Sequence, residues 1–211
     1  FDIAGLEMFL PLYAGGCLVI ASKEMAMDGK ALLKAIEAES VTVMQATPVT
    51  WKLMLAVGWE SSPNLKVLCG GEAFPRDLAN NLVPKAASVW NMYGPTETTV
   101  WSTCDQVTVG EGSVSIGHPI ANTTVYIVDE KLTPLPDGRE GELVIGGDGL
   151  ALGYLSNPEM TAEKFTVLAG TEERVYRTGD LAKFLPDGRL ECLGRIDHQI
   201  KLRGFRIELG E

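Results

Sequence analysis

The stretch NMYGPTETTVW, residues 91–101, brings several side chains that can do chemistry close together. Tyr93 offers an aromatic face, a Gly-Pro pair favours a tight bend, and Thr96 and Glu97 follow with a hydroxyl and a carboxylate. A carboxylate is the kind of hard oxygen ligand that Mg²⁺ prefers, and a hydroxyl can donate a hydrogen bond to a phosphate oxygen. Taken alone, the stretch is equally typical of a strand that ends before a capped helix.

Two other short strings contain groups that suit a nucleotide. GGEAF (70–74) ends a predicted strand, and its glycines allow a planar base to approach the backbone closely. YRTGDL (176–181) carries Asp180, whose two carboxylate oxygens can accept hydrogen bonds from both ribose hydroxyls. A simple helix entry and an ordinary turn aspartate explain these strings equally well when each is considered alone.

Composition limits the classes of partner. The 211 residues are 45% hydrophobic and 22% charged, as in a globular protein that buries a real core. The net charge of −10 argues against nucleic acid or an anionic membrane as a partner, but not against a nucleotide. Four scattered cysteines and two histidines argue against a zinc site and predict buried, reduced thiols in a cytoplasmic protein. No apolar run is long enough to cross a bilayer.

The first half of the chain, residues 1–105, reads as an α/β domain. Short apolar runs alternate with helical patterns there, which predicts a parallel sheet with flanking helices. The predicted strands cover residues 17–22, 41–47, 65–71 and 88–94. Ligands of such sheets gather at the carboxyl ends of the strands, so we expect the last three strand ends to converge on one site.

Residues 106–194 follow a different pattern and predict an antiparallel, barrel-like subdomain. The strand-like runs are residues 123–129, 141–147, 174–185 and 189–195, and Pro-Asp-Gly bends occur at 136–138 and 186–188. A short helix, residues 157–165, interrupts them. The remaining residues, 195–211, alternate in charge and read as a domain junction or a solvated strand pair.

Five strings in this order resemble the core motifs of the adenylate-forming, AMP-binding enzymes, and more narrowly the adenylation domains of nonribosomal peptide synthetases. They are FDIAGLEMF (1–9), YGPTE (93–97), GELVIGGDGLALGYL (141–155), YRTGDL (176–181) and GRIDHQIKLRGFRIELGE (194–211). Each alone is weak, but together they span nearly the whole chain.

The resemblance implies an internal part of a longer protein. The family's phosphate loop would lie before residue 1 and the lysine of its small C-terminal domain after residue 211. The chain also begins without Met, and its last residues, RIELGE, contain no pattern typical of the end of a domain. We therefore expect residues 195–211 to be the hinge and the start of a truncated small domain, and the isolated 211-residue chain to be inactive.

The family reaction joins an amino acid carboxylate to the α-phosphate of ATP, and the aminoacyl adenylate then passes to the phosphopantetheine thiol of a carrier protein. The resemblance thus implies ATP and Mg²⁺ as cofactors, and carrier-protein and condensation domains as partners. It assigns Thr96 and Glu97 to catalysis, Glu97 to the metal and Asp197 to the hinge, with Lys201 and Arg203 near that junction. The nucleotide would be bound by Gly71, Glu72, Ala73, Tyr93, Thr96, Asp180 and Arg195.

The resemblance also assigns a substrate pocket. Asp2 would bind the α-ammonium of the amino acid, although it is also a suitable N-cap for a helix over residues 3–12. The wall would consist of Ile3, Leu6, Gln45, Leu68, Gly70, Met92, Val100 and Trp101. Each of these could equally be a core residue. Together they are bulky and carry no second charge, which favours glycine as the substrate, with alanine next.

Two alternatives stay open at this point. A different acyl- or aryl-CoA ligase of the superfamily would have no ammonium to pair with Asp2. A non-catalytic nucleotide-binding module would keep the fold without the reaction.

Overall fold

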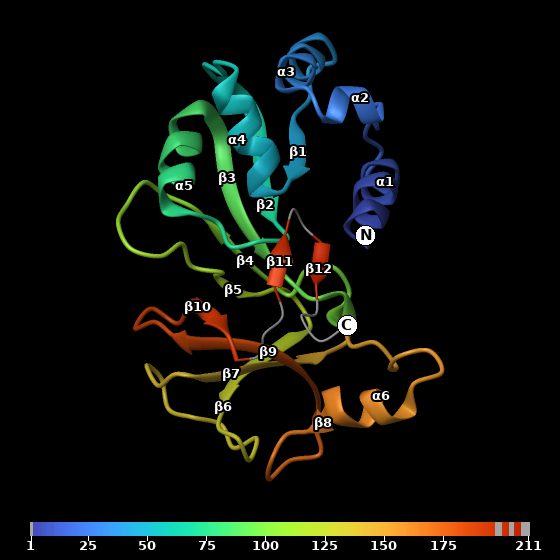
Figure 1. Cartoon of the computed structure of the whole chain (residues 1–211), viewed down its shortest axis with the longest axis vertical. Helices are drawn as coiled ribbons and strands as arrows, with labels where there is room; N and C mark the ends of the chain where they lie inside the picture. The colour runs from blue at the N-terminus through green and yellow to red at the C-terminus, as the bar shows by residue number, and fades with distance from the viewer. Residues whose placement is uncertain (1, 197–199, 203–204, 208–211) are drawn as a thin grey trace. The chain divides into compact units, whose positions relative to one another are not determined.

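The structure is a computed structural model that describes residues 2–196, 200–202 and 205–207 (Figure 1). The chain divides into two compact units. The first unit contains residues 1–91, 106–114 and 201–205, and the second contains residues 92–105, 115–200 and 206–211.

The elements follow one another along the chain in the order given next. They are α1 (Ile3–Tyr13), α2 (Lys23–Ala26), α3 (Gly29–Ala38), β1 (Val43–Ala46), α4 (Pro48–Ala56), β2 (Ser62–Gly70), α5 (Arg76–Leu82), η1 (Val83–Lys85), β3 (Ala86–Tyr93), η2 (Thr96–Thr98), β4 (Thr103–Gln106), β5 (His118–Pro119), β6 (Thr123–Val128), β7 (Gly141–Gly147), α6 (Pro158–Lys164), β8 (Phe165–Val167), β9 (Arg174–Phe184), β10 (Leu190–Arg195), β11 (Ile200–Leu202) and β12 (Phe205–Ile207).

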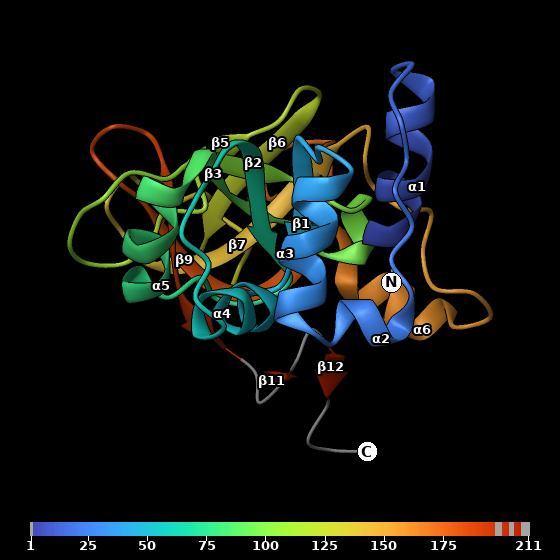
Figure 2. The same cartoon turned by 90° about the horizontal axis from the view of Figure 1, so that it is seen from above.

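The first unit is built on β1, β2 and β3, with α3, α4 and α5 on one face (Figures 1 and 2). β1 and β2 are parallel, as the strand–helix alternation predicts. Alternate residues of β2, among them Leu65, Val67 and Cys69, are fully buried in the core beneath these helices. The core side chains of α4 include Trp51 and Met54, both with no exposed surface. Burial of this apolar face stabilises the helices against the sheet.

Two helices of the first unit begin at residues that suit a helix start. The side chain of Asp28 accepts hydrogen bonds from the backbone N–H groups of Lys30 and Ala31, at 2.9 and 3.3 Å, and so begins α3. Pro48 is the first residue of α4, where its missing N–H costs nothing. Among the described residues, no helix is long and apolar enough to cross a membrane.

The predicted strand at residues 17–22 is wrong. That segment is an irregular connection between α1 and α2, and most of it, including Cys17, is exposed. A β-rich run becomes a strand only if a neighbouring strand satisfies its backbone, and none of the ladders described for the chain includes this segment. The exposure of Cys17 also corrects the expectation that all four thiols are buried.

The second unit contains an antiparallel sheet in the order β10-β9-β7-β6, with β8 also paired to β9. β7 is buried on both faces, because Leu143 and Ile145 belong to one apolar cluster and Val144 to another. The second Pro-Asp-Gly sequence forms the bend between β9 and β10, and its Gly188 has a φ of 81°, which a glycine adopts readily. The fold class predicted from the sequence, an α/β part followed by an antiparallel barrel-like part, is confirmed.

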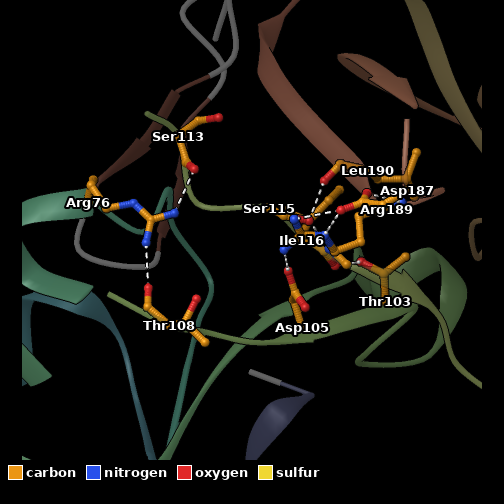
Figure 3. A network of polar contacts seen from close by, with 11 residues as sticks. Arg76, Thr103, Asp105, Thr108, Ser113, Ser115, Ile116, Asp187, Arg189 and Leu190 are labelled. Carbon is orange, nitrogen blue, oxygen red and sulfur yellow. Dashed lines mark hydrogen bonds and ion pairs between the residues drawn. The ribbon is translucent and has the colours of Figure 1, made fainter. Parts of the chain in front are cut away.

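Side-chain hydrogen bonds to backbone carbonyls fix the connections within each unit (Figure 3). In the first unit, the Arg76 guanidinium donates to the carbonyls of Thr108, Gly112 and Ser113, at 2.8–3.2 Å, and so holds the segment that follows β4. In the second unit, Ser115 donates to the carbonyl of Leu190 at 2.9 Å. The Leu190 carbonyl also accepts a hydrogen bond from the Ile116 N–H at 2.9 Å, so Ser115 adds a second donor to it.

Candidate functional site

Glu97 lies in a tight segment after β3, residues 94–102, which we call the glutamate turn. The segment contains the short helix η2, and Glu97 is buried with 6% of its surface exposed. The Tyr154 hydroxyl donates a hydrogen bond to Glu97 Oε1 at 2.6 Å. Thr98 and Ser102 share a further hydrogen bond of 2.6 Å between their hydroxyls. The carboxylate is therefore held in a fixed place, whereas the neighbouring Thr96 is exposed.

The glutamate turn contains strained backbone. Thr99 and Val100 have φ values of 62° and 70°, in the left-handed region that β-branched residues avoid. The Trp101 N–H donates to the Thr99 carbonyl at 2.9 Å, and the Trp101 side chain is 5% exposed. Strain of this kind persists only where the surroundings impose it, and it clusters at functional sites.

Gly94 permits the turn, and we expect Gly94→Ala to destabilise the protein by about 3 kcal/mol. A Cβ at this position would collide with the carbonyl oxygen of Val100 and would stand 2.7 Å from Trp101 Cα and 2.8 Å from Ser102 N. These are backbone atoms that cannot rotate away. Chemical denaturation measures the loss.

The matched control for this change is Gly5→Ala in α1, where an added Cβ meets nothing within 4 Å. That variant should be as stable as the parent or slightly more stable, because alanine favours a helix. Equal unfolding free energies for the parent and Gly94→Ala would contradict the prediction.

Asp180 forms a second carboxylate site in the second unit. It lies on β9 with 6% of its surface exposed. Its Oδ1 accepts a hydrogen bond from Arg195 Nη1 at 2.9 Å, and its Oδ2 accepts one from the Tyr93 hydroxyl at 2.5 Å. β9 and β10 pair directly at Asp180 and Arg195, which explains how residues fifteen apart meet. The structure thus brings together three of the residues that the sequence assigns to the nucleotide.

The hydroxyl of Tyr93 points toward Asp180 and donates a hydrogen bond to it. Burial, followed by the charge of Asp180 and the hydrogen bond to it, raises the pKa of Tyr93 well above its ordinary value. The phenol consequently stays protonated and acts as a donor at any physiological pH. Because Tyr93 and Arg195 engage both Asp180 oxygens, a ribose at Asp180 would have to share or displace these partners.

Asp2 is the N-cap of α1 in the first unit. Its Oδ1 accepts a hydrogen bond from the Ile3 N–H at 2.9 Å. Its Oδ2 is buried and has no hydrogen-bond partner among the described residues. A buried carboxylate oxygen without a partner costs free energy, so it is a candidate for binding a cation. The cap occupies one oxygen of the side chain, and the predicted ligand role would fall on the other.

Three of the predicted pocket residues lie on one face of the sheet in the first unit. Gln45 on β1 is the register partner of Leu68 on β2, and Gly70 follows Leu68 by two residues. Alternate residues of a strand share a face, and this face is opposite the buried Leu65, Val67 and Cys69. Ile3 and Leu6 lie on α1, and both are half-buried.

Glu7 was not identified from the sequence. Its carboxylate lies near the Gln45 side chain of β1. Partial burial raises the pKa of Glu7 above its ordinary value, although the residue as a whole is exposed, and the nearby Gln45 side chain acts in the opposite sense. In the sequence, Glu7 is an acidic residue five positions after Asp2 on a predicted helix. Nothing in that position indicates that it lies near Gln45.

The remaining predicted residues are placed as follows. Gly71, at a φ of 84°, starts the bend after β2, and Glu72 and Ala73 continue it. Met92 is the penultimate residue of β3 and belongs to the second unit, and Lys201 lies in β11. Asp197 and Arg203 lie outside the described residues. No cluster of three or more metal-binding side chains occurs within residues 2–196 or the other described segments.

Comparisons with known proteins concern the sequence and the fold of the chain. The AMP-binding enzyme family matches residues 1–155. The whole chain is 48% identical to part of a dimodular nonribosomal peptide synthase of Bacillus subtilis and covers 9% of that protein. It also resembles two solved structures over its full length. One is a four-domain nonribosomal peptide synthetase bound to AMP and glycine, with 46% identity, a TM-score of 0.90 and 16% of that protein covered. The other is a synthetase with adenylation and PCP domains, with 32% identity, a TM-score of 0.88 and 44% covered.

Proposed function

The chain belongs to the AMP-binding enzyme family, among the adenylation domains of nonribosomal peptide synthetases, and we propose that it selects glycine and activates it with ATP. The observation that carries the amino acid part is Asp2, whose Oδ2 is buried without a partner among the described residues. An α-ammonium group is a cation of suitable charge and donor capacity for that oxygen. A fatty or aryl acid would supply no such donor.

The nucleotide is proposed to bind through the second carboxylate site. Asp180 suits the hydroxyls of a ribose, because its two carboxylate oxygens can accept hydrogen bonds from both hydroxyls, which would share these oxygens with Arg195 and Tyr93 or replace them as donors. Gly71, Glu72 and Ala73 would border the adenine, and Thr96 is exposed and free of steric cover to reach the α-phosphate. Support comes from the relative that was solved with AMP.

Glu97 fits a magnesium ion. Its carboxylate supplies the oxygen chemistry that Mg²⁺ requires, and a single protein carboxylate with substrate phosphates is a common set of ligands for that ion. When bound, the ion would neutralise charge on the phosphates. The chain's own contribution is to hold Glu97 in place, through the glutamate turn and Tyr154.

The whole-protein context is also part of the proposal. We propose that the chain is the middle of an adenylation domain, with the boundaries at 105/106 and 194/195 and a hinge at Asp197, and that it is inactive alone. The adenylate would pass to the phosphopantetheine thiol of a carrier protein, with condensation domains alongside. One relative, which contains adenylation and PCP domains, supports this arrangement. Four free cysteines support the cytoplasm as its location.

Pyrophosphate exchange by the complete adenylation domain, measured over a panel of amino acids and of acids without an amino group, tests the proposal. Glycine should give the highest rate and alanine a lower one, since one methyl group is worth about 1–3 kcal/mol of discrimination. Preference for a large or charged amino acid would refute the glycine assignment. Exchange only with acids that lack an ammonium would favour a CoA ligase, and no exchange would favour a non-catalytic module.

Trp101 and Met92 are proposed to limit the space for the substrate side chain. Trp101→Ala should lower glycine activation and raise the efficiency ratio of alanine to glycine about tenfold, and Met92→Ala should raise it less. A competition assay measures these ratios. Because Trp101 is 5% exposed, its loss should also cost about 3–5 kcal/mol of stability.

The matched control for this substitution is Trp90→Ala, which removes a half-buried tryptophan outside the proposed wall. It should leave the ratio of alanine to glycine unchanged. If Trp101→Ala and Trp90→Ala give the same ratio as the parent, Trp101 is an ordinary core residue.

A further inference from the structure

A loop far along the sequence is bonded to the glutamate turn. This connecting loop, residues 148–157, links β7 to α6. The Ala151 N–H donates to the Glu97 carbonyl at 2.9 Å, and the Thr99 hydroxyl donates to the Gly149 carbonyl at 2.7 Å. Both segments belong to the second unit. The loop is therefore bonded to the backbone within η2 and to the side chain of Thr99, the residue that follows η2.

Tyr154 is the residue of this loop that reaches the Glu97 carboxylate. Its hydroxyl donates to Glu97 Oε1 at 2.6 Å, a hydrogen bond to a charged acceptor. Such bonds are about twice as strong as neutral ones. Glu97 is 6% exposed, so water competes little for this bond.

The position of Tyr154 is itself fixed by its own neighbours. Its backbone N–H donates to the Thr161 hydroxyl at 2.9 Å, and its ring meets the Phe165 ring edge-on, with centroids 5.6 Å apart. Contacts from α6 and β8 thus orient both the backbone and the ring. A phenol held in this way can impose a direction on the carboxylate that it touches.

Arg174 holds the connecting loop from β9. Its Nη1 donates to the Ala151 carbonyl and its Nη2 to the Leu152 carbonyl, both at 2.8 Å. The guanidinium carbon lies 4.6 Å from the centroid of the Phe165 ring, in a cation–π contact. The loop backbone is thus bonded to β9 at Ala151 and Leu152, close to Tyr154.

We propose that Tyr154 is a positioning residue for Glu97, whose phenol holds the carboxylate in the orientation in which it meets a divalent cation. The inference rests on the proposed function, in which Glu97 is the metal ligand. Partners that hydrogen-bond a metal ligand from outside set its orientation, and their loss typically weakens metal binding 10- to 100-fold. Tyr154 lies in the string GELVIGGDGLALGYL, for which the sequence indicated no role.

The test is Tyr154→Phe in the complete adenylation domain. This change removes the hydroxyl and keeps the ring against Phe165. Electron paramagnetic resonance of free Mn²⁺, titrated in the presence of a non-hydrolysable ATP analogue, should show about tenfold weaker cation binding. The Mg²⁺ concentration for half-maximal pyrophosphate exchange should rise by the same factor, while the KM for the amino acid stays unchanged.

The matched control is Tyr126→Phe, since the Tyr126 hydroxyl donates to the Glu173 carboxylate at 2.7 Å in the same unit. It should bind Mn²⁺ as the parent does. If Glu97→Gln reduces Mn²⁺ binding but Tyr154→Phe behaves like Tyr126→Phe, the positioning role is overturned. If Glu97→Gln binds Mn²⁺ like the parent, the assignment of Glu97 to the metal fails first, and the inference with it.

Discussion

Asp2→Asn should reduce amino acid activation by about thirtyfold or more while leaving ATP binding close to that of the parent. Truncating one partner of a buried charge pair costs about 2–5 kcal/mol, which corresponds to this factor or more. Asparagine is as good an N-cap as aspartate, so the hydrogen bond from the Ile3 N–H to the side chain is preserved. The variant therefore removes the charge without removing the cap. Isothermal titration with ATP, and pyrophosphate exchange with glycine, measure the two quantities.

Two controls separate the roles of Asp2. Asp2→Ala should lose amino acid activation to the same extent and should also lose about 1 kcal/mol of stability with the cap. Asp28→Asn changes an exposed capping aspartate of α3 in the same manner and should leave activation unchanged. If Asp2→Asn activates glycine as well as the parent, Asp2 is only a cap, and the assignment of the substrate site fails.

Local sequence chemistry was sufficient for much of the fold. The Pro-Asp-Gly bend before β10 was predicted, because such a bend is specified by its own few residues. The capping residue Asp28 and the proline at the start of α4 act over the same short range. The run at residues 17–22 shows the limit of this reasoning. Its composition favours a strand, but strand formation depends on a neighbour that the run itself does not specify.

The candidate site shows the same limit at the level of side chains. Motif resemblance identified Tyr93, Asp180 and Arg195, and the structure brings them within hydrogen-bond distance. The motif resemblance did not identify the hydrogen bond between Tyr154 and Glu97, because 57 residues separate them and only the packing of the connecting loop places them together. Periodicity and propensity contain no information on such a contact, which depends on tertiary structure alone.

The two Asp180 partners also change what the site can be expected to do. From the sequence we expected the Asp180 carboxylate to be available to ribose hydroxyls and the Tyr93 ring to be available to the nucleotide. In the structure the carboxylate is already bonded to Arg195 and to the Tyr93 phenol. Nucleotide binding at Asp180 would thus exchange hydrogen bonds rather than fill empty positions, so the net gain per bond is modest.

The largest combined loss of stability and nucleotide binding is expected for Asp180→Ala. The ion pair of Asp180 with Arg195 is mostly buried, with 9% and 16% of the two side chains exposed. Removing one partner of a buried pair costs about 3–5 kcal/mol, because the other charge is left uncompensated. Asp187→Ala is the matched control, since Asp187 pairs with Arg189 in the exposed bend between β9 and β10, and exposed pairs contribute little to stability. Chemical denaturation of both variants measures the difference in unfolding free energy.

Nucleotide discrimination then separates a ribose contact from a purely structural ion pair. The variant for this measurement is Asp180→Asn, which keeps the shape of the side chain and a hydrogen-bond acceptor. If Asp180 accepts the ribose hydroxyls, the parent should bind ATP more tightly than 2′-deoxy-ATP and 3′-deoxy-ATP, by about tenfold for each bond to a charged acceptor. Asp180→Asn should bind ATP more weakly and should discriminate much less among the three nucleotides.

If Asp180 and Arg195 form only a structural ion pair, the expected result differs. ATP binding then falls with stability, but the ratios of affinity among the three nucleotides stay those of the parent. That outcome would move the ribose away from Asp180 and leave Arg195 and Tyr93 as partners that only hold β9 and β10 in place.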